Sequence, residues 1–290
     1  MLFEFAPAKL NLYLHILGKR DDGYHDLESL IAFCSVGDII AVYPDDNITL
    51  SVTGLFSGLL LDNINDNLVI QSARALQNRL SLKKGAKIFL KKNLPIGAGI
   101  GGGSADSAAT LRLLQRLWNV TAPEPMIYDI ASEIGADVPV CIDSQARLVS
   151  STGVTLHSPI SLPPIWAVLV NSGEFLATKH IFKELKIKQQ RHPPTDRAIP
   201  LHALQTSENL LLWIQSKRND LECIATELYS TISHILEELH RMNPQPQIVR
   251  MSGSGGTCFA LYLHEHPASI ACLALQEKHP AWSCQVVCLT

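Results

Sequence analysis

Hydrophobic and polar residues alternate along several short stretches of the chain, and this pattern predicts β-strands. Residues 9–16 read Lys-Leu-Asn-Leu-Tyr-Leu-His-Ile, which places four apolar side chains on one face and four polar ones on the other. Similar alternation predicts strands over 38–43, 48–52 and 86–90. Because the polar face of the first strand carries one formal charge, we expect this strand to be half buried and to line a wet cleft.

Apolar residues recur at helical spacing between and after these strands. Residues 67–80 form one such segment, for which Asp66 or Asn67 provides the cap. Residues 108–117 form a second segment, and Ser104 occupies the position expected of its N-cap. The first half of the chain is therefore predicted to combine strands with amphipathic helices.

A third predicted helix, residues 126–134, should stop at Gly135. Asp137 then lies between this stop and an extended Val-Pro-Val segment at 138–140, where rigid neighbours would aim its carboxylate. Taken alone, a turn-forming aspartate is the simpler interpretation of this residue.

The pattern restarts after residues 151–164, a stretch rich in serine, proline and glycine that is typical of a linker. At 290 residues the chain exceeds the usual size of one hydrophobic core, so we place a boundary there and predict domains 1–157 and 158–290. The second domain is expected to contain, in order, a strand at 166–170, helices at 178–185 and 220–242, strands at 247–251 and 257–263, a helix at 268–277 and a strand at 283–289. This order is typical of a split β-α-β sheet with helices on one face.

The most informative segment is 93–109, Asn-Leu-Pro-Ile-Gly-Ala-Gly-Ile-Gly-Gly-Gly-Ser-Ala-Asp-Ser-Ala-Ala, in which five glycines run into the second predicted helix. Pro95 ends the preceding strand because it cannot donate to a ladder. Glycine backbone can adopt positive φ and bring several N–H groups to one anion, and a helix N-terminus adds partial positive charge. The segment is therefore predicted to bind the phosphates of a nucleoside triphosphate. Since this loop has no lysine, its cation must come from elsewhere.

Other interpretations of the glycines fit the sequence less well. Gly97, Gly99 and Gly102 match the G-x-G-x-x-G of dinucleotide-binding folds, but the region about 20 positions later is a turn at 121–125 rather than an acidic strand end. No Gly-Lys-Ser/Thr follows the loop, and the sequence lacks the His-Arg-Asp and Asp-Phe-Gly motifs of protein kinases. In a connector without a ligand, five glycines would lose conformational entropy on folding for no gain in packing.

Composition narrows the class of protein. Hydrophobic residues make up 47% of the chain and charged residues 18%, as in ordinary globular proteins, and the formal net charge of −3 argues against nucleic acid as a partner. The seven cysteines include no C-x-x-C pair, so we expect reduced thiols, a cytoplasmic location and no metal site built from them. The N-terminus has no signal-peptide pattern and no apolar run reaches membrane-spanning length, which predicts no membrane attachment.

Several polar residues are ambiguous when each is taken alone. An isolated lysine such as Lys9 is most often a solvated residue at a strand edge. Tyr24 offers a flat face and His25 a donor and an acceptor, so the pair could hold a heterocyclic base or simply pack the turn before it. Residues 251–257, Met-Ser-Gly-Ser-Gly-Gly-Thr, form either a glycine-rich hairpin or a second turn that wraps a phosphate or ribose.

Taken together, the motifs resemble the GHMP superfamily of small-molecule kinases, named for galactokinase, homoserine, mevalonate and phosphomevalonate kinases. Three segments match it: Pro-Ala-Lys-Leu-Asn-Leu at 7–12, Leu-Pro-Ile-Gly-Ala-Gly-Ile-Gly-Gly-Gly-Ser at 94–104 and Ser-Gly-Ser-Gly-Gly-Thr at 252–257. Within it, the chain looks like the family of 4-diphosphocytidyl-2-C-methyl-D-erythritol kinases of the non-mevalonate isoprenoid pathway. Gly-Lys-Arg-Asp-Asp-Gly-Tyr-His-Asp at 18–26 and Ile-Gly-Ala-Asp-Val-Pro-Val at 134–140 carry that narrower resemblance.

The resemblance implies an α+β fold of two domains: an N-terminal α/β domain like ribosomal protein S5 and a C-terminal ferredoxin-like domain, with the active site in the cleft between them. It implies that Asp137 is the general base toward a substrate hydroxyl and that Lys9 is the cation beside it. The cofactors would be ATP and Mg²⁺, the metal being held mainly by the nucleotide phosphates. The ATP-binding residues would be Asn67, Pro95, Gly97, Gly99, Gly101, Gly102, Gly103, Ser104 and Ala105, and the substrate-binding residues Asn11, Tyr24, His25, Thr178 and Phe182.

The expected activity is ATP-dependent phosphorylation of the 2-hydroxyl of a cytidine diphosphate-linked polyol by a monomer or homodimer. Two alternatives stay open: a sibling kinase that acts on homoserine or mevalonate, and a nucleotide-binding regulator that has lost catalysis. The sibling would leave Tyr24, His25 and Phe182 without a base to hold. The regulator would need neither Lys9 nor Asp137.

Overall fold

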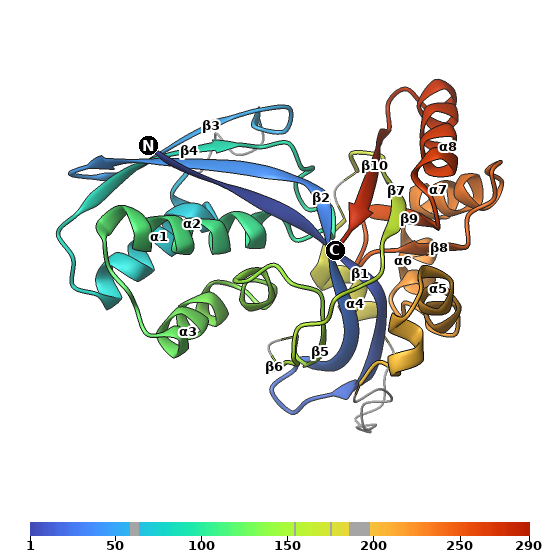
Figure 1. Cartoon of the computed structure of the whole chain (residues 1–290), viewed down its shortest axis with the longest axis horizontal. Coiled ribbons are helices and arrows are strands. Elements are labelled where there is room, and N and C mark those ends of the chain that lie inside the picture. The colour runs from blue at the N-terminus through green and yellow to red at the C-terminus, as the bar shows by residue number, and fades with distance from the viewer. Residues whose placement is uncertain (59–63, 154, 175, 186–197) are drawn as a thin grey trace. The chain divides into compact units, whose positions relative to one another are not determined.

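The computed structural model describes residues 1–58, 64–153, 155–174, 176–185 and 198–290 (Figure 1). Its contacts form two compact units. The first unit comprises residues 1–9, 36–96 and 101–144, and the second unit comprises residues 10–35, 97–100 and 145–290. Two long strands, β1 (Leu2–Lys19) and β2 (His25–Asp45), each contribute residues to both units.

The first unit is a small sheet with helices against it. β4 (Gly85–Lys91) pairs antiparallel with β2 and parallel with β3 (Ile48–Thr53). Ile40, Val42 and Ile88 are fully buried, whereas Ile39 and Tyr43 are partly exposed, so the alternation in the sequence reflects one covered face. The helices are α1 (Leu68–Arg79), α2 (Gly102–Trp118) and α3 (Glu124–Ile134), and Figure 1 shows all three on the same side of these strands.

The start of each helix depends on the residue before it. Asn67 caps α1 as predicted, because its Oδ1 accepts a hydrogen bond of 2.9 Å from the backbone N of Val69. The prediction that Ser104 caps α2 is wrong. The helix begins at Gly102, and its N-cap is Gly101, which has a φ of 63°. Since glycine enters a helix from the left-handed region without steric cost, the glycine run itself forms the first turn.

The second unit contains four antiparallel strands in the order β10-β7-β9-β8, and β10 also pairs with β2 at Leu289 and Cys34. This order is that of the ferredoxin-like domain that the family resemblance implies. The strands are β7 (Ile165–Asn171), β8 (Ile248–Met251), β9 (Thr257–Tyr262) and β10 (Ser283–Leu289). The helices are α4 (Thr178–Glu184), α5 (Ser207–Gln215), α6 (Glu222–Leu228), α7 (Ser230–His240) and α8 (Glu265–Lys278), with a 3₁₀ turn η4 at Leu201–Leu204.

Two predicted elements differ from the structure, and one helix was not expected. The long helix at 220–242 is two helices, α6 and α7, because Tyr229 between them is extended with a φ of −132°. Helix α5 was not predicted. The polar face of the first strand is buried rather than wet: Lys9, Asn11, Tyr13 and His15 are at most 7% exposed. Side chains from other elements therefore cover both faces of β1.

Part of the predicted linker at 151–164 is also structured. β5 (Arg147–Ser151) pairs antiparallel with residues 27–31 of β2, and β6 (Thr155–Leu156) pairs with β5. Whether the domain boundary falls at 157/158 stays a prediction.

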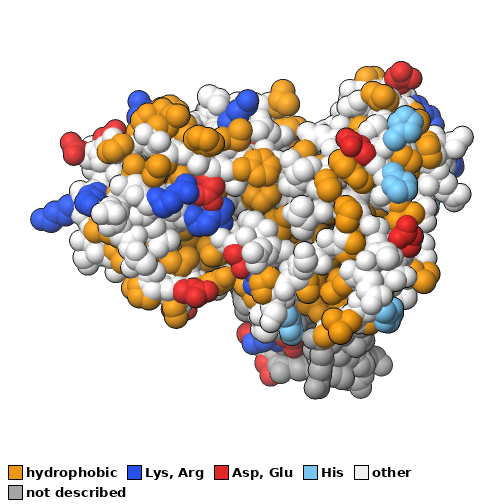
Figure 2. All heavy atoms as spheres, viewed as in Figure 1, with side chains coloured by type: hydrophobic (Ala, Val, Ile, Leu, Met, Phe, Trp, Pro, Cys, Tyr) orange, Lys and Arg blue, Asp and Glu red, His pale blue; other side chains and the backbone are white. Residues whose placement is uncertain are grey.

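The distribution of charged side chains on the surface and the state of the cysteines agree with what the composition suggests. Figure 2 shows Lys and Arg side chains interspersed with Asp and Glu on the face in view, as the small net charge would suggest. All seven cysteines are free thiols, and burial raises the pKa of Cys34 to about 12. Among the helices in the described part of the chain, none combines the length and the apolar character needed to cross a bilayer.

Candidate functional site

The first unit brings Lys9 and Asp137 together. Nζ of Lys9 lies 3.1 Å from Oδ2 of Asp137, although 128 positions separate the two residues in the sequence. The lysine side chain is 5% exposed and the aspartate side chain 45% exposed, so the carboxylate remains open to a ligand. Gly101 lies against the same lysine, because a Cβ placed on it would be 2.5 Å from Cγ of Lys9. The ion pair therefore borders the glycine loop.

Arg112 of α2 holds the segment that follows Asp137. Its Nη1 donates to the carbonyl oxygens of Cys141 at 2.7 Å and Ile142 at 2.6 Å, and its Nε pairs with Glu4 of β1. These carbonyls end a 3₁₀ turn, η3 (Pro139–Cys141). The prediction that Val-Pro-Val at 138–140 is extended is thus wrong, because the chain forms a turn here. The guanidinium of Arg112 donates hydrogen bonds to carbonyl oxygens that have no partner within the turn. Arg112 consequently ties the Asp137 segment to α2 and to the strand that carries Lys9.

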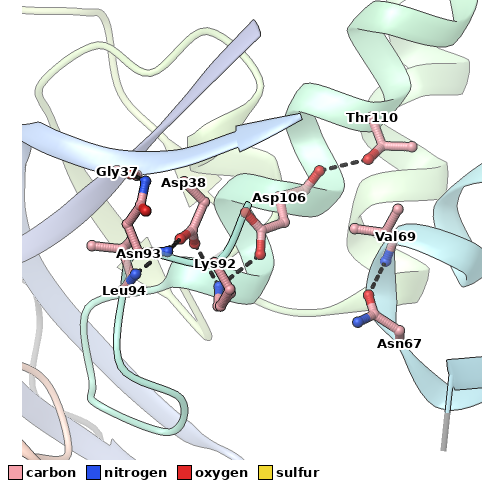
Figure 3. Close-up of polar contacts among 9 residues, drawn as sticks. All are labelled: Gly37, Asp38, Asn67, Val69, Lys92, Asn93, Leu94, Asp106 and Thr110. Carbon is pink, nitrogen blue, oxygen red and sulfur yellow. Dashed lines mark hydrogen bonds and ion pairs between the residues drawn. The ribbon is translucent and has the colours of Figure 1, made fainter. Parts of the chain in front are cut away.

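A buried cluster lies under the glycine loop (Figure 3). Nζ of Lys92 is 2.5 Å from Oδ2 of Asp38 and 2.7 Å from Oδ2 of Asp106, and all three side chains are at most 4% exposed. Oδ1 of Asp38 accepts from the backbone N of Asn93 at 2.6 Å and of Leu94 at 2.9 Å. Asp38 thus holds the chain that enters the loop, while Asp106 lies on the helix that leaves it, and Lys92 joins the two.

The electrostatics of this cluster single out Asp106. Burial raises the pKa of this carboxyl to about 7, with the Asp38 carboxylate adding to the effect and Lys92 opposing it. Within the described residues, Oδ1 of Asp106 is a buried oxygen without a hydrogen-bond partner.

In the second unit, the middle of the glycine loop packs on the turn between β8 and β9. Oγ of Ser252 donates to the carbonyl oxygen of Gly99 at 3.2 Å and accepts from the backbone N of Asn11 at 3.2 Å. A Cβ on Gly99 would lie 2.2 Å from the carbonyl oxygen of Gly255. Asn219 supports the turn by donating from Nδ2 to the carbonyl oxygens on either side of Ser252. This glycine-rich turn therefore shapes the loop through direct backbone contact.

The second unit also contains an aromatic contact between two of the predicted substrate-binding residues. The ring centroids of His25 and Phe182 are 5.3 Å apart and the rings are tilted by 35°. Burial, assisted by Lys19, lowers the pKa of His25, which favours a neutral imidazole with one donor and one acceptor. In the part of the chain that the structure describes, its Nε2 is buried and has no hydrogen-bond partner. Tyr24 beside it is 67% exposed.

The remaining predicted residues are distributed over both units. Oγ1 of Thr178 lies 2.7 Å from Oγ of Ser254, and Nδ2 of Asn11 donates to Oγ of Ser29 at 2.8 Å. The predicted site residues in the first unit are Lys9, Asn67, Pro95, Gly101, Gly102, Gly103, Ser104, Ala105 and Asp137, and those in the second unit are Asn11, Tyr24, His25, Gly97, Gly99, Thr178 and Phe182.

Sequence reasoning missed Asp38, Lys92, Asp106 and Arg112. Asp106 lies two positions after Ser104, inside the glycine-loop segment, and was the one member that the motif itself could have pointed to. Lys92 and Asp38 are 54 positions apart, and no local pattern connects them. Among residues with described positions, no group of three or more His, Cys, Asp or Glu is arranged to hold a metal ion.

Two family models match the chain. The model described as "GHMP kinases N terminal domain" matches residues 67–145, and the one described as "GHMP kinases C terminal" matches residues 198–281. A protein of Parvibaculum lavamentivorans named 4-diphosphocytidyl-2-C-methyl-D-erythritol kinase is 41% identical over 284 residues, which cover 98% of this chain and 96% of that protein.

Solved structures show the same relation. A crystal structure of 4-(cytidine 5'-diphospho)-2C-methyl-D-erythritol kinase superimposes with a TM-score of 0.79 at 27% identity and covers 99% of both chains. A homoserine kinase from Cytophaga hutchinsonii superimposes with a TM-score of 0.70 at 18% identity, covering 100% of this chain and 94% of that one, and this likeness concerns the fold alone.

The contact between the glycine loop and the turn should make Gly99 intolerant of any side chain. Gly99→Ala places a methyl group against the carbonyl oxygen of Gly255 at a φ of +73°, which should cost more than about 1 kcal/mol of unfolding free energy. Urea denaturation measures this loss. Gly103→Ala is the control, because its Cβ would meet only Cδ1 of Leu68 at an ordinary 3.4 Å. Equal midpoints for the two variants would contradict the prediction.

Proposed function

Since this chain belongs to the GHMP kinases, and among them to the family of 4-diphosphocytidyl-2-C-methyl-D-erythritol kinases, we propose that it transfers the γ-phosphoryl group of ATP to the 2-hydroxyl of 4-diphosphocytidyl-2-C-methyl-D-erythritol. One observation carries the chemistry of this proposal. The ammonium of Lys9 lies 3.1 Å from the Asp137 carboxylate, and both border the glycine loop at Gly101. The proposed base, the proposed cation and residues 101–105 of the loop thus belong to one unit.

Asp137 is the general base in this proposal. Its carboxylate is half exposed, so a substrate hydroxyl can reach it and give up its proton as the oxygen attacks the γ-phosphorus. Lys9 is buried and paired with that carboxylate, so its position is set before substrate arrives. Its charge would balance negative charge that develops during transfer, which is the main contribution a protein makes to phosphoryl transfer.

The glycine loop would hold the ATP phosphates. The N-cap of α2 is Gly101, which has no side chain to cap the first turn, so the N–H groups of Gly102, Gly103 and Ser104 are suited to bind an anion. Pro95, Gly97, Gly99, Ala105 and Asn67 are the other residues proposed to border the nucleotide.

Mg²⁺ would enter with the nucleotide in this proposal. The described residues offer no ready cluster of metal-binding side chains, which suits an ion held mainly by phosphate oxygens and water. When bound, the metal would supply positive charge that offsets the charge of the phosphates.

The second unit provides the groups proposed to recognise the substrate. A neutral His25 has a donor and an acceptor for a cytosine edge, and Phe182 adds a ring face 5.3 Å away. Asn11, Tyr24 and Thr178 are proposed to contact the rest of the substrate. These features favour a cytidine substrate over homoserine or mevalonate, because neither of those molecules has a base to stack.

A coupled assay of ADP release with three alcohols tests the proposal. We expect ATP turnover with 4-diphosphocytidyl-2-C-methyl-D-erythritol and none above background with homoserine or mevalonate. Turnover with either of the latter would support a sibling kinase. Nucleotide binding without turnover of any alcohol would support a non-catalytic regulator.

Removing the charge of Asp137 tests the general base. Asp137→Asn should lower kcat by about 10²-fold or more, because an amide cannot accept the proton, while the KM for ATP stays within about twofold. Steady-state kinetics at saturating substrate measure both constants. Asp129→Asn, on the exposed surface of α3, is the control and should match the wild type. Turnover near the wild-type rate in Asp137→Asn would remove this residue from the mechanism.

Arg112 should act as a positioning residue for Asp137. Arg112→Gln frees the carbonyls of Cys141 and Ile142, so the carboxylate shifts and kcat should fall about tenfold or more while the KM for ATP changes little. Arg116→Gln is the matched control, since Arg116 pairs with the same Glu4 at 3.1 Å and is 53% exposed. A parallel loss of kcat in both variants, or a change in the KM for ATP alone, would contradict this role.

A further inference from the structure

The buried cluster of Asp38, Lys92 and Asp106 has an unbalanced charge count. Two carboxylates share one ammonium, and no side chain of the three is more than 4% exposed. With both carboxylates ionised, the cluster would bury a net charge of −1. A buried charge without a partner is costly, so a site of this kind tends to gain a proton or a counterion.

The cluster lies next to the N-terminus of α2, which is proposed to bind the ATP phosphates. A Cβ on Gly102, the first residue of α2, would be 3.1 Å from Nζ of Lys92 and 3.5 Å from Oδ2 of Asp38. Figure 3 shows the Lys92 side chain between the two carboxylates at the start of this helix. At such short range and low dielectric, a net negative charge would oppose the binding of a polyphosphate.

The two carboxylates differ in their hydrogen bonds. Asp38 uses both oxygens: Oδ1 accepts from the backbone N of Asn93 and Leu94, and Oδ2 accepts from Lys92. Asp106 pairs with Lys92 through Oδ2, and among the described groups its buried Oδ1 meets no donor. A proton added to the cluster therefore disrupts the fewest hydrogen bonds if it binds to Oδ1 of Asp106.

We propose that Asp106 takes up one proton when ATP binds, so that the cluster is neutral in the nucleotide complex. This inference rests on the proposed function only in assuming that the glycine loop holds the ATP phosphates. The proton comes from solvent and ends on Oδ1 of Asp106. By linkage, the affinity for ATP must then fall as the pH rises through the range where the free protein loses this proton.

The ionisation of the free protein suits this role. A pKa of about 7, which burial raises above the usual value, leaves Asp106 mostly ionised at pH 8 and ready to accept a proton. The charged groups facing it are Lys92, which follows β4, and Asp38 from β2. Burial raises the pKa of the Cys141 thiol of η3, which interacts electrostatically with Asp106, so that thiol is uncharged in this range. Added phosphate charge would raise the pKa of Asp106 further.

Isothermal titration calorimetry measures the proton uptake. AMP-PNP with Mg²⁺ is titrated into the protein at pH 8 in buffers of different ionisation enthalpy, and the slope of the apparent enthalpy gives the protons bound. The wild type should take up close to one proton more than Asp106→Asn, in which the amide cannot titrate. Protonation of the nucleotide itself cancels in this difference. Asp129→Asn is the control and should behave as the wild type.

The outcomes separate this inference from the proposed function. Nucleotide binding with equal proton uptake in the wild type and Asp106→Asn would overturn the inference alone. A wild type that binds no nucleotide would overturn the proposed function. If Asp106→Asn does not fold, infrared difference spectroscopy of the wild type decides: a carboxylic-acid C=O band that appears with AMP-PNP supports the inference, and its absence overturns it.

Discussion

The structure depends on the supply of positive charge to a glycine loop that has none. Lys9 belongs to β1 and Lys92 follows the last residue of β4. Both lie so close to the loop that a methyl group on Gly101 or Gly102 would crowd them, at 2.5 Å from Cγ of Lys9 and 3.1 Å from Nζ of Lys92. Glycines are needed at these two positions because they leave room for the lysine side chains. The conformation of the loop backbone and the positions of the two lysines therefore depend on each other.

Lys9 pairs with one aspartate and Lys92 with two, and the two groups differ in how far their carboxylates are buried. Asp137 is 45% exposed beside Lys9, so its carboxylate can meet a substrate. Asp38 and Asp106 are at most 3% exposed beside Lys92, so they can act only through the loop that they hold. The same chemical pairing thus leaves a carboxylate open to ligand in one place and is enclosed under the loop in the other.

The second unit contributes backbone packing against the loop and the residues proposed to recognise the substrate. Its antiparallel sheet presents the turn at 252–256, whose backbone lies against Gly99, and its helix α4 carries Phe182 toward His25. The likeness to kinases at 18% identity concerns only the fold, whereas the relative at 41% identity spans nearly the whole chain. Substrate choice should therefore reside in such local contacts, which differ between kinases that share one architecture.

The sequence by itself determined the features that depend on local spacing: the alternating strands of both sheets, the cap at Asn67, and a glycine loop running into a helix. The family resemblance, which rests on motif order, indicated the pairing of Lys9 with Asp137. Tertiary structure alone decided which polar residues are buried, where Tyr229 breaks a helix, and that Lys92 joins carboxylates 54 and 14 positions away. Burial and long-range charge pairing depend on elements that approach only in the folded chain, so no local pattern encodes them.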